Sequence, residues 1–399
     1  IVRKTLSKEE RQQFHADIAR MVVATNSPFS WVDHPLVRRF FVKWFGLALP
    51  SRKKLTTTLL RREIGLLDIS VKKTVKGLVV TLTCDGWNNV QGQHLVAFVI
   101  TVGGKSYTIA VVDNSAVNKT GDLAYQHIVE QIEAVEQKYG CLVGGVCTDS
   151  GGDCARARIL VNASHPHIIT APCYAHQVNL VVKDGIEKSP ELKATAKQLA
   201  EVVTWFTHHS IPHALVRDAQ KPKEGEKQRV LTFIRPVITR WTSNLASAKR
   251  LLELEKVIRI LLIEARERLV AAAGKKKEKR EKAEAILNLV DTADFWRRVK
   301  DKVSVLEPLA TAANIAQATN CRLDQILLLL GRLYLVFVAL RDDPNSFVLV
   351  KAAASVILAS LNTRFEAADQ EALVGTTVLN PFVGRQPLGL SSLVRQWHG

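Results

Sequence analysis

The sequence is short of acidic residues, methionine and aromatic side chains, and it has no long apolar run. Its 399 residues include 38 Asp and Glu against 55 Lys and Arg, one Met and 6% aromatic residues. No apolar stretch approaches the about 18 residues of a membrane span, and no signal peptide opens the chain. We therefore expect a globular protein without a membrane partner, of two or three domains.

Cysteine is too scattered for a disulfide framework. Three of the six cysteines, Cys84, Cys141 and Cys147, lie in or beside apolar segments, where free cysteine packs as a small apolar residue. This usage favours a reducing, intracellular compartment.

A C-x-x-H pair raises the alternative of structural zinc. Cys173 and His176 supply half of such a site, and His165 and His167 just upstream could complete four ligands. Against this, His167 leads directly into the apolar residues 168–171, which are typical of a strand. A strand would fix the direction of the His167 side chain.

The acid shortage gives a net charge of +17 and an isoelectric point near 9.7. Such an excess favours a polyanionic partner, and nucleic acid is the usual one, although basic surfaces also serve solubility. The run Lys275–Arg280 is open to two interpretations, a nuclear-import or phosphate-binding patch and the solvated face of a helix. The first residues, Ile1-Val2-Arg3-Lys4, suggest a fragment or a processed form.

The periodicity of apolar residues divides the chain into four parts. Residues 1–73 predict helices, including one over 8–23 that Ser7 caps and one over 36–47. Residues 74–185 predict strands and helices in the order β-β-β-α-β-α-β-α, with strands over 78–83, 95–102, 107–112, 142–148 and 167–171. Residues 186–376 predict helices throughout, with one long helix over 245–269 and no repeat of fixed period. Residues 377–399 carry Gly384, Pro387 and Gly389 and predict a loosely ordered tail.

Two aspartates stand where apolar strands are predicted to end. Asp85 follows the strand of residues 78–83, and Asp149 follows that of residues 142–148. Two converging carboxylates can hold a divalent metal for phosphoryl transfer. The alternative is that each Asp caps a turn or a helix.

The predicted strand order favours convergence of this pair. Three antiparallel strands followed by parallel crossovers are the order of ribonuclease H-like nucleases and integrases. In that fold the first and fourth strands are neighbours, so we expect Asp85 and Asp149 to face one site. The predicted fold class is an α/β ribonuclease H-like domain with a mixed five-stranded sheet, a large all-α insertion and an N-terminal helical region.

Four motifs in this order resemble the hAT superfamily of DNA transposases, in particular its fungal and plant relatives. The motifs are Cys84-Asp85-Gly86-Trp87, Thr148-Asp149-Ser150-Gly151-Gly152, Ala171-Pro172-Cys173-Tyr174-Ala175-His176-Gln177-Val178-Asn179-Leu180 and Thr239-Arg240-Trp241-Thr242-Ser243. The resemblance extends over about residues 10–385.

The resemblance implies roles for six residues. Asp85 and Asp149 match the first two acids of a catalytic triad that binds Mg²⁺ or Mn²⁺. Cys173 and His176 match the motif in which the histidine lies beside the active site and positions DNA. Arg240 and Trp241 match an Arg-Trp motif near the cleaved DNA end, where an aromatic face stabilises an extruded base by roughly 1–3 kcal/mol. Without the resemblance, a core tryptophan and a structural histidine are the simpler interpretations.

The sequence departs from the family pattern at both ends. The third acid, a glutamate, is expected after the insertion, and Glu307, Glu366 and Glu371 are the late acids available. Glu307 matches an insertion-domain position. The upstream zinc finger and the C-terminal dimerisation signature have no counterpart, so homo-oligomerisation is expected through segments outside this chain.

Two functions remain open at this point. The first is a nuclear DNA transposase core that acts on transposon ends, catalytically incomplete as it stands. The second is a domesticated or degenerate relative that binds DNA or protein without catalysis. A ribonuclease for RNA–DNA hybrids shares the fold, but it would not explain the helical insertion.

Overall fold

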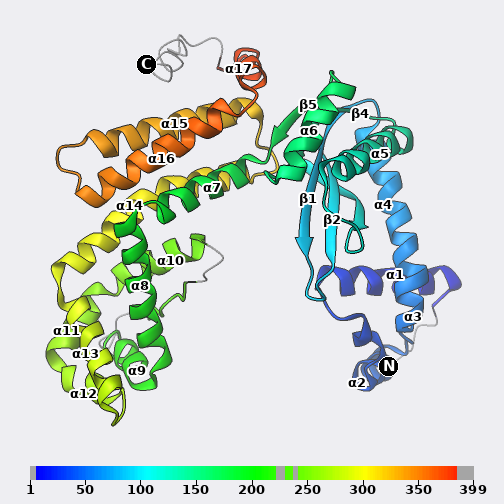
Figure 1. Cartoon of the computed structure of the whole chain (residues 1–399). Coiled ribbons are helices and arrows are strands. Elements are labelled where there is room, and N and C mark those ends of the chain that lie inside the picture. Colours follow the sequence, from blue (N-terminus) through cyan, green and yellow to red (C-terminus); the bar gives the residue numbers. More distant parts are fainter. Residues whose placement is uncertain (1–5, 222–229, 237–240, 384–399) are drawn as a thin grey trace.

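The computed structural model describes residues 6–221, 230–236 and 241–383 (Figure 1). N-terminal helices lead into a five-stranded sheet, and helix α7 connects the sheet to a region built of helices.

The N-terminal region consists of short helices around a small apolar core. Its elements are α1 (Lys8–Ala24), η1 (Phe29–Asp33), α2 (Pro35–Phe45), α3 (Arg52–Lys54), the π-helical η2 (Leu55–Leu59) and α4 (Leu60–Val75). Ser7 caps α1 through a reciprocal capping box with Glu10, as the sequence predicts. The second predicted helix ends early, at Phe45, because Gly46 adopts a left-handed conformation with φ of 68°.

The sheet has the strand order β3-β2-β1-β4-β5. Its strands are β1 (Val79–Asn88), β2 (His94–Val102), β3 (Lys105–Asp113), β4 (Leu142–Thr148) and β5 (Ile169–Pro172). β1, β2 and β3 pair antiparallel, whereas β4 is parallel to both β1 and β5. The first and fourth strands are therefore neighbours, as predicted.

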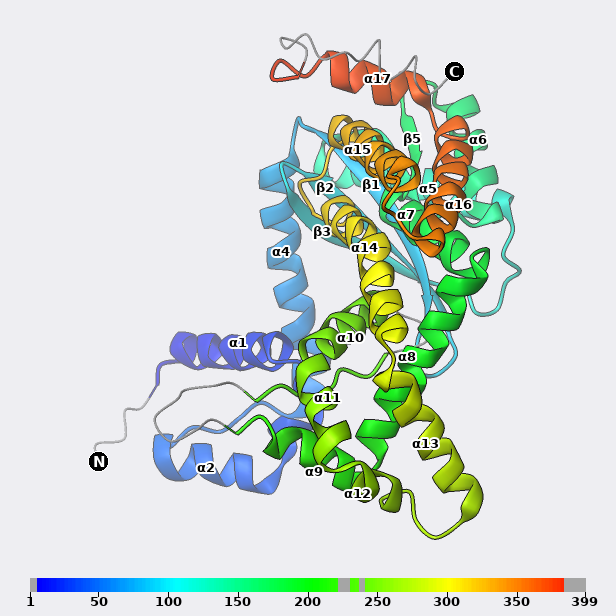
Figure 2. The same ribbon diagram turned by 90° about the vertical axis from the view of Figure 1, so that its left-hand side faces the viewer.

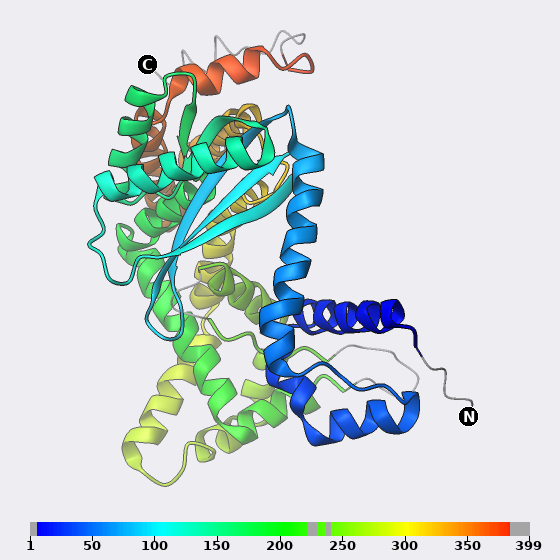
Figure 3. The ribbon, with the colours of Figure 1, turned by 90° about the vertical axis from the view of Figure 1, so that its right-hand side faces the viewer.

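Only one face of the sheet is deeply buried. Helices α5 (Gly121–Tyr139) and α6 (Gly152–Ser164) pack with it around Leu82, Phe98 and Val146 (Figure 3). On the opposite face five large apolar side chains are exposed: Val79, Trp87, Val111, Leu142 and Ile169. The tight hairpin between β2 and β3 turns at Gly103 and Gly104, both at positive φ.

Helix α7 (Tyr174–Glu187) leaves the sheet and packs against α14 and α16. The remaining helices are α8 (Pro190–His208), α9 (Ser210–Asp218), α10 (Trp241–Glu253), α11 (Glu255–Glu264), α12 (Arg266–Ala271), α13 (Lys277–Asp291), α14 (Ala293–Ala316), α15 (Leu323–Asp342), α16 (Val348–Glu366) and α17 (Gln370–Val378). Figure 2 shows how these helices are arranged. They enclose two apolar clusters, one around Leu309 and Phe337 and one around Phe206 and Trp296.

Two expectations for the helical region are wrong. The single helix predicted over 245–269 is three helices, α10 to α12, because the chain turns at Leu254 and Ala265. A helix, α9, occupies most of the predicted break around His208–His213.

Three further expectations have structural counterparts. All six cysteines are free, so the prediction of no disulfide framework is confirmed. The basic run Lys275–Arg280 is exposed at the start of α13, as the solvated-helix interpretation requires. Of the tail, residues 377–383 are described and 384–399 lie outside the described residues.

Helices α15 and α16 are long and apolar enough to cross a membrane. The expectation that no stretch of the chain has this character was therefore wrong. About half of each apolar window is buried, 44% and 50%, and the two helices pack against each other in the core around Phe337. This packing is typical of core helices, which pass the same test of length and composition.

Candidate functional site

A pocket of about 190 Å³ lies at the end of the sheet where β1 and β4 run side by side. Asp85 and Asp149 both line it, together with Asp153 and Cys154 of α6 and His127 of α5. The parallel pairing of β1 with β4 thus places the two predicted acids at the same end of the sheet. The pairing ends at Cys84 opposite Thr148, one residue before each acid.

Asp85 lies inside β1 and not beyond its end, which corrects the sequence prediction. The strand continues to Asn88 because β2 pairs with it residue by residue, with Asp85 opposite Ala97. Alternation places the Asp85 side chain on the face opposite to buried Cys84, and Asp85 is exposed. The strand holds it rigidly, and its side chain lies on the opposite face of the sheet from Cys84 and Phe98, which also line the pocket.

Asp149 forms a turn, which is the alternative role considered for it. Its Oδ1 atom accepts a hydrogen bond of 2.8 Å from the backbone N–H of Gly151, so the residue does form the turn that leads into α6. Arg158 fixes the same turn by donating to the Asp149 carbonyl at 2.7 Å and to the Thr148 hydroxyl. The turn orients the half-buried carboxylate toward the pocket that Asp85 also lines.

Asp153 is a candidate that the sequence analysis missed. One ligand atom each from Asp149, Asp153 and Cys154 lie within 4.8 Å of one another. Among the described residues this is the group of three or more potential metal ligands, and Asp85 is not a member of it. The signal was present as an Asp-x-x-x-Asp spacing across the first turn of α6. Acidic residues at the start of a helix are also favoured by the helix dipole, so this spacing does not single out a metal site.

The chemistry of the cluster suits a hard divalent cation. Carboxylate oxygens are the ligands that Mg²⁺ and Mn²⁺ prefer. The pKa of the Cys154 thiol is raised by its hydrogen bond with Cys84, by burial and by the Asp149 carboxylate. Two of the three potential ligands in the group are carboxylates.

Histidine also surrounds the pocket. His94 and His127 both line it, and the buried Nε2 atom of His127 has no hydrogen-bond partner among the described residues. The sequence analysis singled out neither residue, because each is an isolated histidine in a strand or helix pattern.

The C-x-x-H pair lies at the start of α7, next to the end of β4. The backbone N–H of Cys173 donates to the Thr148 carbonyl at 2.6 Å, and Gln177 donates to the Ser150 hydroxyl at 2.6 Å. The third motif therefore contacts the second. The zinc alternative gains no support, because no group of three potential ligands in the described part of the chain contains Cys173 or His176.

Trp241 begins α10 and is half-buried against the apolar cluster around Leu309. Its Nε1–H donates to Oδ1 of Asn179 on α7 at 2.8 Å, which ties the fourth motif to the third. This contact is the structural role that the residue type alone suggested. Arg240 lies outside the described residues.

The late glutamates are not at the pocket. Glu307 on α14 forms an ion pair with Lys249 of α10, as fits its assignment to the insertion. Glu366 and Glu371 lie on α16 and α17, and none of the three lines the pocket around Asp149.

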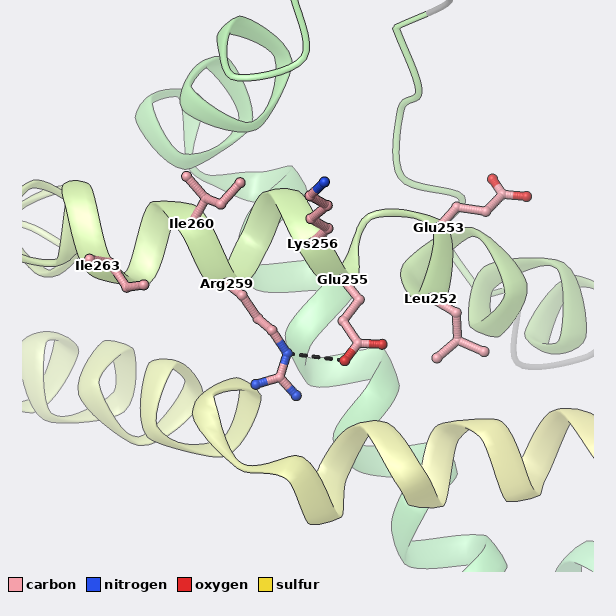
Figure 4. A pocket seen from close by; sticks show the side chains of 7 residues that line it. All are labelled: Leu252, Glu253, Glu255, Lys256, Arg259, Ile260 and Ile263. Atoms are coloured by element: carbon pink, nitrogen blue, oxygen red, sulfur yellow. Dashed lines mark hydrogen bonds and ion pairs between the residues drawn. The ribbon is translucent and has the colours of Figure 1, made fainter.

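A second hollow, of about 380 Å³, lies on the surface of α10 and α11 (Figure 4). Leu252, Ile260 and Ile263 line it, with Glu255 and Arg259 paired at 3.0 Å along its edge. It holds no arrangement of carboxylates, thiols or histidines comparable to that around Asp149.

Residues 50–202 match the model of a protein family described as Domain of unknown function (DUF659). The match extends from the helix before the sheet, through all five strands, to α8, and it includes Asp85, Asp149, Cys173 and His176. No curated protein matches the chain.

Proposed function

We propose that this protein is a transposase-related nucleic-acid-processing core of the hAT type, built on a ribonuclease H-like domain. The pocket lined jointly by Asp85 and Asp149 carries the proposal. The sheet order β3-β2-β1-β4-β5, with its change from antiparallel to parallel pairing at β1, is the arrangement expected of that fold. The DUF659 family, found in transposase-like proteins, supports the same assignment.

In this proposal Asp85 and Asp149 hold Mg²⁺ or Mn²⁺, and Asp153 is a further candidate ligand. When bound, the divalent ion would supply the charge that stabilises a phosphodiester under attack and its leaving oxygen. The protein's own contribution is to fix the carboxylates: β1 holds Asp85 in register with Ala97, and Gly151 and Arg158 hold the turn at Asp149.

The proposed DNA contacts are those that the resemblance to hAT transposases implies. Cys173 and His176 at the start of α7 are proposed to meet the DNA near the acids, and Arg240 and Trp241 to meet the cleaved end. The net charge of +17 supports a nucleic-acid partner. Nuclear location, homo-oligomerisation through further segments and the absence of a membrane partner are part of the same proposal.

The proposal divides the chain into an N-terminal helical region over 1–73, a ribonuclease H-like core over 74–185, a helical insertion over 186–376 and a tail. The alternative is a domesticated relative that binds DNA or protein without cutting. The positions of Glu307, Glu366 and Glu371 away from the pocket favour that alternative.

Strand nicking tests the proposal and separates the two functions. The full chain would be incubated with Mn²⁺ and either a DNA duplex or an RNA–DNA hybrid, and DNA binding measured in parallel. Asp149→Asn should abolish nicking and preserve binding, whereas Asp113→Asn, which removes a carboxylate outside the pocket, should preserve both.

Each outcome has a distinct meaning. DNA nicking lost in Asp149→Asn supports a catalytic core, and DNA binding without nicking supports the non-catalytic relative. Preference for the hybrid, or neither binding nor nicking, would overturn the assignment.

A further inference from the structure

Helix α2 carries a row of exposed apolar side chains beside a row of cations. None of its residues is buried, and Leu36, Phe40 and Trp44 are 67%, 51% and 53% exposed. Residues four apart are neighbours on one face of a helix, so these three side chains form one continuous row. Arg39 and Lys43 have the same spacing and form a parallel row next to it. Exposed apolar side chains gathered in this way mark an interaction site.

The aromatic rings of α2 are held in place by the small N-terminal core. Phe41 is half-buried in that core, with its ring centroid 6.2 Å from that of Phe14 and 6.3 Å from that of Trp31. The exposed rings of Phe40 and Phe45 lie 5.8 Å and 5.7 Å from the ring of Phe41. A partner that stacks on these rings finds them already ordered, which reduces the entropic cost of binding.

The charge of α2 favours an anionic partner. The helix contains three cations and no acid. Arg38 serves the protein itself, since it pairs with Asp33 at 2.6 Å and donates to a backbone carbonyl of η1 at 3.1 Å. Arg39 and Lys43 pair with no acid among the described residues. Instead, Nζ of Lys43 lies 4.8 Å from the centroid of the Trp44 ring, so a cation stands directly beside an exposed aromatic face.

We propose that α2 binds single-stranded DNA through a surface formed by Arg39, Phe40, Lys43, Trp44 and Phe45, the α2 surface. Aromatic faces on which bases stack, combined with cations for the phosphates, are the usual means of holding single strands without sequence preference. The α2 surface contributes no residue to the pocket around Asp149, and it lies at the end of the N-terminal region remote from α5 (Figures 1 and 2). The proposal therefore goes beyond strand cleavage, because a single strand can bind here whether or not the pocket cuts.

The structure favours a single strand over other partners. In a duplex the bases stack on one another, so their faces are not open to aromatic side chains. An anionic membrane would take up the apolar face of the helix, but Val37 and Phe41 on that face already pack on the N-terminal core. A second copy of the α2 surface would bring cations against cations.

Fluorescence anisotropy of the full chain with a labelled oligothymidylate of about 16 nucleotides tests the stacking. Trp44→Ala should weaken binding about fivefold or more, because one aromatic ring is lost, and Trp44→Phe should retain most of the affinity. Phe382→Ala is the matched control, since Phe382 is 88% exposed and lies outside α2. This control should bind as the wild type does.

A second pair of variants tests the phosphate contacts. In Lys43→Gln the slope of log affinity against log salt should fall by about 0.7, the value for one phosphate contact on a single strand. Arg38→Gln removes the same charge from the same helix, but Asp33 holds Arg38, so the slope should not change. Lys43 is exposed, so its replacement keeps the proposal testable even if Trp44→Ala is less stable than the wild type.

Three alternative partners are probed with the same variants: the duplex of the oligothymidylate with oligoadenylate, phosphatidylserine vesicles, and a second copy of the chain by sedimentation. A loss in Trp44→Ala that is confined to the single strand supports the proposal. Equal affinity of Trp44→Ala and the wild type for the oligothymidylate would overturn it. A larger effect of Trp44→Ala on duplex binding, vesicle binding or self-association would also overturn it. Absence of nicking would count against the catalytic core and not against the α2 surface.

Discussion

Gly151 lies between the carboxylates of Asp149 and Asp153 in the proposed metal site. A Cβ atom placed on Gly151 would lie 2.5 Å from Oδ1 of Asp153 and 3.2 Å from Oδ1 of Asp149. The φ angle of Gly151 is −59°, which any residue can adopt, so the requirement is for space and not for backbone freedom. Asp149 and Asp153 can approach each other as they do because position 151 carries no side chain.

Gly151→Ala should therefore impair the metal site more than the fold. We expect Mn²⁺ affinity to fall about tenfold or more, as for other groups that orient ligands. The unfolding temperature should change little, because the obstructed atoms end flexible side chains. Gly152→Ala is the matched control, since a Cβ there meets nothing within 4 Å. Equal Mn²⁺ affinities of the two variants, measured by titration calorimetry, would contradict this account.

Among the individual residues of the candidate site, the sequence predicted some and missed others, and each outcome has a physical reason. Asp149 was predictable because an apolar strand ends directly before it. Asp85 was predicted to lie beyond the end of its strand, but residues 85–88 continue the strand by pairing with β2, which a local pattern does not reveal. The bond between Trp241 and Asn179 joins residues 62 positions apart and leaves no local signal.

Among the elements, helix α7 connects the sheet with the helical region. Asp184 of α7 accepts a hydrogen bond of 2.7 Å from Ser360 and pairs at 3.0 Å with Arg364, both on α16. Burial raises the pKa of Asp184, but the hydrogen bonds from Ser360 and Lys188 and the charge of Arg364 outweigh it, so the pKa lies below its usual value. The charged carboxylate thus stabilises the contact of α7 with α16.

Asp184→Asn should lower the free energy of unfolding at pH 7 by about 1 kcal/mol. Because the folded-state pKa lies below the unfolded value of about 3.9, the stabilisation is complete at neutral pH. It is lost as the pH falls through the folded-state pKa, so the difference between variant and wild type should shrink below about pH 4.

Urea unfolding at several pH values measures this difference, with Glu187→Gln on the same helix as the control. A difference that grows on acidification would show that Asp184 does not act through its charge.

The elements themselves were largely predictable. The strand over 142–148 and the helix that ends at Gly140 follow from apolar periodicity and a glycine at the helix end. The division of residues 245–269 into three helices was not, because Leu254 and Ala265 carry no helix-breaking chemistry and the turns depend on packing.

For the molecule as a whole, the order of strands was predictable and the placement of the helical regions was not. The N-terminal region meets α5 through Asp68 of α4, which pairs with Lys138 at 2.8 Å and accepts from the Tyr139 hydroxyl at 2.6 Å. Contacts between residues 70 positions apart follow from the folded arrangement and not from local pattern. Net charge, in contrast, is a property of the whole molecule that the sequence gives directly.

The charge of +17 predicts salt-dependent binding to duplex DNA. Release of counterions from the phosphates should weaken binding at least about tenfold between about 50 and 200 mM salt. Fluorescence anisotropy with a labelled duplex at several salt concentrations measures this. Affinity that does not change with salt would show that the basic residues do not contact phosphates.

The most direct test of the central claim, that Asp85 and Asp149 form one metal site, is calorimetric titration of the full chain with Mn²⁺. Wild type and Asp113→Asn should bind alike, while Asp85→Asn and Asp149→Asn should each lose about tenfold or more in affinity. Binding unchanged in both pocket variants, or lost in Asp149→Asn alone, would contradict a shared site and leave Asp85 as a strand residue without a role in metal binding.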